Sequence, residues 1–174
     1  MKLALLLAGS LSALLAQGGA GAPPAPAPQP EAAPAHVRIT IRCIAASNDP
    51  SAPAGLDAKL APIATHLESF GEQFRFRSYK LLQVETVDLD WKAGAQIELP
   101  DSRSLQLTPR QLEPDGKIKV HLELLGEHPA HSRKLHTDYS IQRGGTILVG
   151  GLRVDPADEK SGKLLIAVTQ EMEK

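Results

Sequence analysis

The chain has 174 residues, enough for one folded domain, with 19 Lys and Arg residues against 20 Asp and Glu residues and a formal net charge of -1. Because the two signs are interspersed, the charge pattern argues against nucleic acid or anionic lipid as a partner. Only 3% of the residues are aromatic, which also argues against a base-stacking or carbohydrate-binding surface.

Residues 1–20 have the pattern of a secretory signal peptide. A positive start is followed by the apolar run Leu3–Ala16 and by small residues at 18–22. An apolar run of about 14 residues is too short to cross a bilayer about 30 Å thick as a helix. We place cleavage after Ala20, because cleavage after Ala22 would leave proline directly beyond the scissile bond. The sequence predicts export to the periplasm or secretion, with no membrane span once the signal is removed.

Residues 21–35 are almost entirely alanine and proline, which predicts an extended tether that cannot bury enough apolar area to fold. The only cysteine, Cys43, lies beyond this tether. No cysteine stands directly after the apolar run of the signal, so we do not expect a lipid anchor. A single thiol cannot form an internal disulfide, so the fold of residues 36–174 must depend on its apolar core.

The first elements of this domain are a strand and a helix. Apolar residues alternate with polar ones over Val37–Cys43, which predicts a strand. From Leu56 to Phe70 the apolar spacing changes to that of one helix face, with Asp57 as N-cap and Gly71 as a stop. Pro62 predicts either a kink or a helix that begins late.

The rest of the chain reads as strands separated by turns. Within Tyr79–Trp91 the apolar residues change phase, first Leu82 and Val84, then Val87, Leu89 and Trp91. This change predicts a bulge or short turn near Glu85–Thr86. Turns are predicted at Pro114–Gly116, at Gly144–Gly145 and at Ser161–Gly162. The predicted fold class is therefore mainly β, an antiparallel β-sandwich or partly rolled sheet of about eight or nine strands with one early helix.

Four histidines are the candidates for a metal site or a cryptic enzyme: His121, His128, His131 and His136. Their spacing matches no common zinc pattern, and no carboxylate pair completes it along the sequence. Surface histidines are the simpler interpretation, and metal binding or catalysis is the alternative.

No other pattern predicts catalysis. No serine stands in a Gly-x-Ser-x-Gly elbow, and the glycine pairs lack the helix and Lys-Ser/Thr partner of a phosphate loop. Cys43 falls at an apolar strand position, where cysteine behaves as a small hydrophobic residue. We therefore expect no catalytic residues, no cofactor and no resident metal.

The C-terminal part resembles the β-domain of bacterial secretins. The resemblance is carried by Thr137–Ile141, the turn Gln142–Gly145 and the run Thr146–Leu152, which is similar to a G-x-T-hydrophobic-G-G-L strand; Leu107–Pro109 and Leu112–Ile118 are similar to the hairpin before it. The match covers about a third of the chain. It implies an envelope β-module, a small relative or accessory of secretion machinery, but no pore, because a pore needs longer strands and more domains. The chain also resembles small exported proteins of unknown function.

The function that we expect is a protein-binding module that pairs a partner's strand with one of its own sheet edges. The candidate edges are Val37–Ile44 and Thr146–Leu152, with outward residues Arg38, Thr40, Arg42, Thr146 and Leu148. A structural subunit that oligomerises through its sheet is a further alternative. The partner would be an envelope protein whose identity the sequence does not give.

Overall fold

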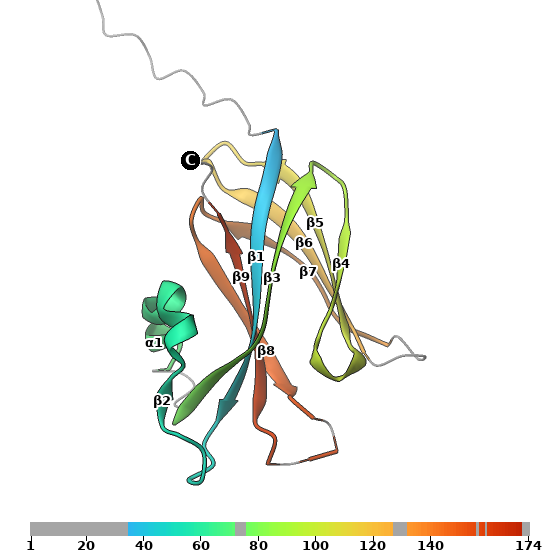
Figure 1. Ribbon diagram of the computed structural model, residues 1–174. Coiled ribbons are helices and arrows are strands. Elements are labelled where there is room, and N and C mark those ends of the chain that lie inside the picture. The colour runs from blue at the N-terminus through green and yellow to red at the C-terminus, as the bar shows by residue number, and fades with distance from the viewer. Residues whose placement is uncertain (1–34, 72–75, 127–131, 156, 159, 172–174) are drawn as a thin grey trace, which may run out of the picture. The chain divides into compact units, whose positions relative to one another are not determined.

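A computed structural model describes residues 35–71, 76–126, 132–155, 157–158 and 160–171. The predicted signal peptide and all of the predicted tether except Ala35 lie outside the described residues. In the described part, two sheets are stacked one behind the other, with β1 and β3 in front of β5, β6 and β7 (Figure 1).

The larger sheet has the strand order β2-β3-β1-β9-β8. Its pairs are antiparallel except for the short parallel pair of β2 with β3. The strands are β1 (His36–Ser47), β2 (Gly55–Leu56), β3 (Ser78–Asp90), β8 (Thr146–Arg153) and β9 (Lys163–Gln170).

The smaller sheet has the order β4-β5-β6-β7 and is antiparallel throughout. Its strands are β4 (Ala95–Glu98), β5 (Ser104–Leu112), β6 (Ile118–Leu125) and β7 (Arg133–Ile141). The predicted turn at Pro114–Gly116 joins β5 to β6, and Gly116 has the left-handed backbone (φ 81°) that glycine adopts at no steric cost. The predicted fold class, a mainly β sandwich with one early helix, is confirmed.

The main core lies between the two sheets. Strand β6 shows how it forms, because its residues alternate strictly between buried and half-buried positions along the strand. Ile118, Val120 and Leu122 are fully buried there, and the facing sheet supplies Ile39, Ile41 and other fully buried side chains. Cys43 belongs to this core and is fully buried, as predicted.

A second apolar cluster covers part of the outer face of the larger sheet. It packs Leu60, Ile63 and Leu67 against a set of strand residues that point away from the main core: Ile44, Ala46, Leu165 and Ala167. The first two helical residues of this cluster come from a 3-10 helix (Ala58–Ile63) and the third from α1 (Ala64–Gly71). A further 3-10 turn spans Pro100–Ser102.

The early helix begins late, as Pro62 predicted. Asp57 caps the 3-10 segment, where its carboxylate accepts a hydrogen bond from the Lys59 amide at 3.0 Å. Regular α-helix starts only at Ala64, two residues after the proline. The reason is that proline lacks the amide proton that an α-helix interior requires.

The prediction of a bulge near Glu85–Thr86 is wrong. The register between β1 and β3 shifts between Cys43, which faces Gln83, and Ile44, which faces Leu81, so the extra residue is Leu82. Before this bulge, Tyr79 and Leu81 pack on the outer cluster, and after it Val87 and Leu89 pack on the main core. Leu82 and Val84, which had suggested an apolar phase of their own, are instead exposed, at 37% and 54%.

Candidate functional site

The first predicted edge, Val37–Ile44, is not an edge, and this prediction is wrong. Strand β1 pairs with β3 on one side and with β9 on the other, so its backbone groups are already used. The C-terminal strand β9 inserts beside β1, and nothing in the local pattern of β1 reveals a neighbour more than 100 residues away in sequence.

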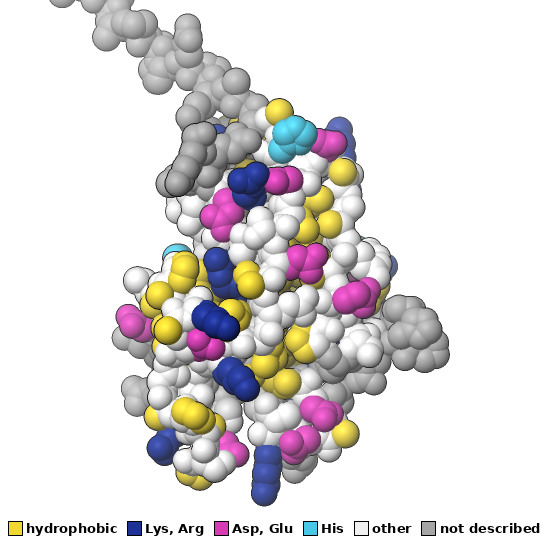
Figure 2. All heavy atoms as spheres, viewed as in Figure 1, with side chains coloured by type: hydrophobic (Ala, Val, Ile, Leu, Met, Phe, Trp, Pro, Cys, Tyr) yellow, Lys and Arg dark blue, Asp and Glu magenta, His cyan; other side chains and the backbone are white. Residues whose placement is uncertain are grey.

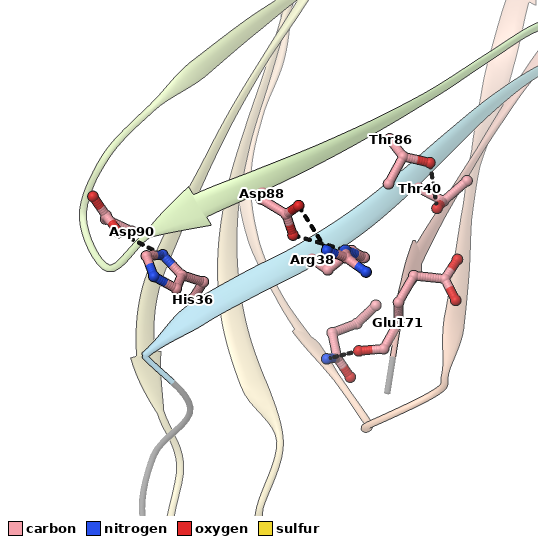
Figure 3. A network of polar contacts seen from close by, with 8 residues as sticks. His36, Arg38, Thr40, Thr86, Asp88, Asp90 and Glu171 are labelled. Atoms are coloured by element: carbon pink, nitrogen blue, oxygen red, sulfur yellow. Dashed lines mark hydrogen bonds and ion pairs between the residues drawn. The ribbon is translucent and has the colours of Figure 1, made fainter. Parts of the chain in front are cut away.

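The outward side chains of β1 form cross-strand pairs. Both nitrogens Nε and Nη2 of Arg38 donate to Asp88, at 2.8 and 2.9 Å, and the hydroxyls of Thr40 and Thr86 lie 2.9 Å apart (Figure 3). Arg42 donates from Nη1 to Thr169 Oγ1 at 3.4 Å. These three predicted site residues therefore connect strands within the sheet.

The second predicted edge, β8, does lie at an edge. Within the described residues it pairs with β9 alone. Because the Gln170 amide donates to the Gly145 carbonyl at 3.0 Å, alternation along the strand directs the backbone groups of Ile147 and Val149 toward β9. Thr146, Leu148 and Gly150 then direct their N–H and C=O groups outward.

A bulge ends this pairable stretch. Gly150 faces Leu165 and Leu152 faces Leu164, so Gly151 is the extra residue, with φ 121°. Bulges are one way in which edge strands limit uncontrolled pairing. The bulge also changes the phase of the strand. Arg153 faces Lys163, which itself faces the outer-cluster residue Ala46, so Arg153 lies on the same face of the sheet as Leu148.

A groove of about 480 Å³ borders β8 on this outer face. Its apolar residues, Phe70 and Leu148, also pack on the outer cluster, and its remaining residues are polar. The groove is lined by Thr65, His66, Ser69, Phe70, Thr146 and Leu148. Two of the predicted interaction residues, Thr146 and Leu148, thus share one groove with α1.

A second hollow, of about 570 Å³, lies near the other end of β8. It includes three cationic residues, Arg153, Lys160 and Lys163, together with Asp49. Hydrogen bonds from the Ser51 hydroxyl and amide lower the pKa of Asp49, and the charge of Lys160 adds to this effect. On the face of the molecule seen in Figure 2, positive and negative side chains are interspersed.

The histidine group is brought together only in part. Strand pairing places His121 opposite Asp138 and Glu123 opposite His136, so two histidines and two carboxylates form a block on the outer face of β6 and β7. One ligand atom from each of His121, Glu123 and His136 lies within 4.8 Å of the others. His128 and His131 lie outside the described residues.

Glu123 is the residue that sequence reasoning missed. The sequence contained part of the signal, because His121 and Glu123 are two residues apart in a strand and so share a face. Adding His136 required the register of the partner strand. Arg133 donates to Glu123 Oε1 and is the main cause of the lowered pKa of that carboxyl. His121 Nδ1 lies 2.7 Å from Asp138 Oδ1, and this hydrogen bond is the main cause of the lowered pKa of Asp138.

The described residues contain no helix of the length and apolar character needed to span a membrane. Comparison with known proteins found no matching family model, no matching curated protein and no matching solved structure.

Proposed function

We propose that this protein is a binding module, not an enzyme, that captures an extended segment of a partner protein along strand β8. The observation that carries the proposal is the outward row of backbone groups at Thr146, Leu148 and Gly150, which pairs with no strand in the described part of the chain. A partner strand could continue the sheet there through main-chain hydrogen bonds, each contributing about 0.5–1.5 kcal/mol net.

The two hollows beside β8 indicate which side chains the partner segment would carry. The groove beside Leu148 favours an apolar side chain, since Phe70 and Leu148 supply its apolar lining. The hollow beside Arg153 favours an acidic side chain, because among the described residues its three cationic residues outnumber its one carboxylate, Asp49.

The register sets the spacing between these two side chains. Leu148 faces Ala167 and Arg153 faces Lys163, which are 167 - 163 = 4 ladder positions apart because the bulge at Gly151 adds no step. Four positions correspond to about 13 Å at about 3.3 Å per residue. We therefore propose an extended partner segment that pairs along Thr146–Gly150 and continues past the bulge, with an apolar and an acidic residue four positions apart on the same face.

We further propose that the module works outside the cytoplasm, in the periplasm or after secretion. The support is the signal-like pattern of residues 1–20, and N-terminal sequencing of the protein from its native host tests it. The resemblance of residues 137–152 to secretins makes secretion machinery the first place to seek the partner. In this chain, however, those residues span β7 and β8, which belong to different sheets.

Site-specific photo-crosslinking tests the proposed function. A photoreactive residue replaces Thr146 in the native host, and Arg110, exposed on the other sheet, is the control position. We expect adducts from position 146 alone, mapping to an extended segment of another protein with the apolar-acidic spacing. Adducts between two copies of this chain would favour the structural-oligomer alternative, and equal labelling at both positions would contradict an edge site.

A pair of variants separates the backbone from the side chain at the same position. Leu148→Pro removes the outward amide without removing a hydrogen bond to β9, whereas Leu148→Val keeps that amide and an apolar side chain. We expect the crosslinking yield at position 146 to fall in the proline variant and to persist in the valine variant, with both variants folded by circular dichroism.

A further inference from the structure

The outer face of β6 and β7, in the smaller sheet, carries a second chemical feature that is independent of strand β8. The block of His121, Glu123, His136 and Asp138 comes from strictly paired positions: His121 faces Asp138, and Glu123 faces His136. Residues that face each other across antiparallel strands have Cβ atoms about 4.5–5.5 Å apart, so paired strands hold such a set without help from loops.

The hydrogen bonds of the block leave specific atoms for a ligand. An ionised Asp138 only accepts hydrogen bonds, so His121 Nδ1 must donate to it, and the neutral ring keeps its lone pair on Nε2. This carboxylate-histidine arrangement fixes the ring's orientation and raises its basicity, as it does for histidines bound to metals.

The two carboxylate oxygens of Glu123 also have different neighbours. Its Oε1 accepts from Arg133, whereas Oε2 lies 3.7 Å from His136 Nδ1 and is turned toward the histidines. The rings of His121 and His136 meet edge to face, with centroids 4.5 Å apart. The side chains of His121 and Glu123 are only 14% and 15% exposed, and that of His136 is 50% exposed, so the set is partly sheltered but open to solvent.

From this geometry we infer that His121, Glu123 and His136 form a binding site for a divalent transition-metal ion, with Zn²⁺ as the representative ion. Two imidazoles and one carboxylate are a ligand set that zinc takes, with a fourth position left for water or another donor. Ligands about 2.0–2.1 Å from a tetrahedral ion lie about 3.3 Å apart. One ligand atom of each residue already lies within 4.8 Å of the other two, so side-chain rotation is enough to close the set without moving the strands.

The charges around the block also suit a dication. The carboxylates of Glu123 and Asp138 bring two negative charges to it, and hydrogen bonds to Arg133 and His121 keep their pKa values lowered. Among the described residues, three cations compete with a metal ion: Arg133 already holds one oxygen of Glu123, and the charges of Arg110 and Lys119 act on Asp138. We therefore expect the site to bind Zn²⁺ and other ions that favour imidazole nitrogen more tightly than Mg²⁺ or Ca²⁺, because those two ions favour all-oxygen sites.

The test is a zinc titration of purified, tag-free protein at pH 7.5 in competition with a chromophoric chelator. We expect one zinc ion per chain. The variants His121→Ala, Glu123→Gln and His136→Ala should each weaken binding more than about tenfold, and Asp138→Asn should weaken it about 10–100-fold through the orientation of His121. Cobalt substitution gives a second readout, because a tetrahedral site changes the visible absorption of Co²⁺.

Two controls make the test specific. His36→Ala removes a histidine that also pairs with an aspartate, Asp90, at 2.7 Å but belongs to no metal-ligand group among the described residues, and it should leave the zinc affinity unchanged. The double variant His128→Ala/His131→Ala should also leave it unchanged. No zinc binding by the folded wild type, binding that survives His121→Ala and His136→Ala, or binding lost in the double variant would each overturn this site.

Discussion

The guanidinium of Arg38 binds both carboxylate oxygens of Asp88 across β1 and β3, at 2.8 Å from Nε to Oδ1 and 2.9 Å from Nη2 to Oδ2 (Figure 3). Bidentate pairs of this kind are among the stronger surface interactions, because two parallel hydrogen bonds fix the geometry of both groups. The pair sits on the outer face of the larger sheet, between a central strand and its neighbour.

The Arg38–Asp88 pair predicts a pH dependence of stability. The hydrogen bonds from Arg38 are the main cause of the lowered pKa of Asp88. Because the folded pKa lies below the unfolded value of about 3.9, the pair stabilises the fold above that value and loses this effect as the pH falls through the folded pKa. Asp88→Asn should therefore reduce the difference in free energy of unfolding between pH 7 and pH 2.5, measured by urea denaturation. An unchanged difference would contradict the assignment, and Arg38→Gln should reproduce the effect.

The position of the bulge in β3 predicts which apolar residues of that strand carry stability. Leu89 is 8% exposed and belongs to the main core, so Leu89→Ala should lower the free energy of unfolding by about 2–5 kcal/mol. Val84 is 54% exposed, so Val84→Ala should change it by less than about 0.5 kcal/mol. Chemical denaturation of both variants checks this, and a large loss for Val84→Ala would place the bulge elsewhere.

Substitution by alanine should destabilise the fold to different extents at two glycines that have similar backbone conformations. Gly116 (φ 81°) has open space where a Cβ would lie, so Gly116→Ala should cost only the backbone strain of about 1–2 kcal/mol. At Gly162 (φ 85°) a Cβ would lie 2.7 Å from the Ala46 carbonyl oxygen, so Gly162→Ala should cost clearly more. Equal melting temperatures for the two variants would show that the β8–β9 hairpin end does not pack against β1 as described.

Removing either of two buried hydroxyls should have opposite effects on the free energy of unfolding. Thr40 is 4% exposed and its hydroxyl bonds to that of Thr86, so Thr40→Val should lower the free energy of unfolding by about 1 kcal/mol. The buried Ser104 hydroxyl has no hydrogen-bond partner within the part of the chain that the structure describes. Ser104→Ala should therefore leave stability unchanged or raise it by up to about 1 kcal/mol, since it removes an unsatisfied polar group. A loss in the Ser104→Ala variant under the same denaturation conditions would indicate a partner for that hydroxyl.

Local patterns in the sequence were enough for the fold class and for many of the turns. The alternation of apolar residues along β6 predicted its buried face, and Pro62 predicted the late start of α1, because both effects act over a few residues. The bulge in β3 was misplaced because Leu82 and Val84 are apolar but exposed, so residue type alone assigned them to the wrong phase.

The sites needed information that local patterns do not carry. An edge strand is defined by what lies beside it, and β1 is central only because β9 returns to it from the C-terminal end of the chain. Likewise, His121 and Glu123 meet His136 only through the register of β6 with β7.

By itself, the sequence determined that this is a β protein with a core of alternating apolar residues, because side-chain burial in a strand follows a period of two. Only the tertiary structure decided which strand is an edge and which histidines share a face. Strand order and register are set by contacts between segments that lie far apart in the sequence, and no local pattern of residues encodes those contacts.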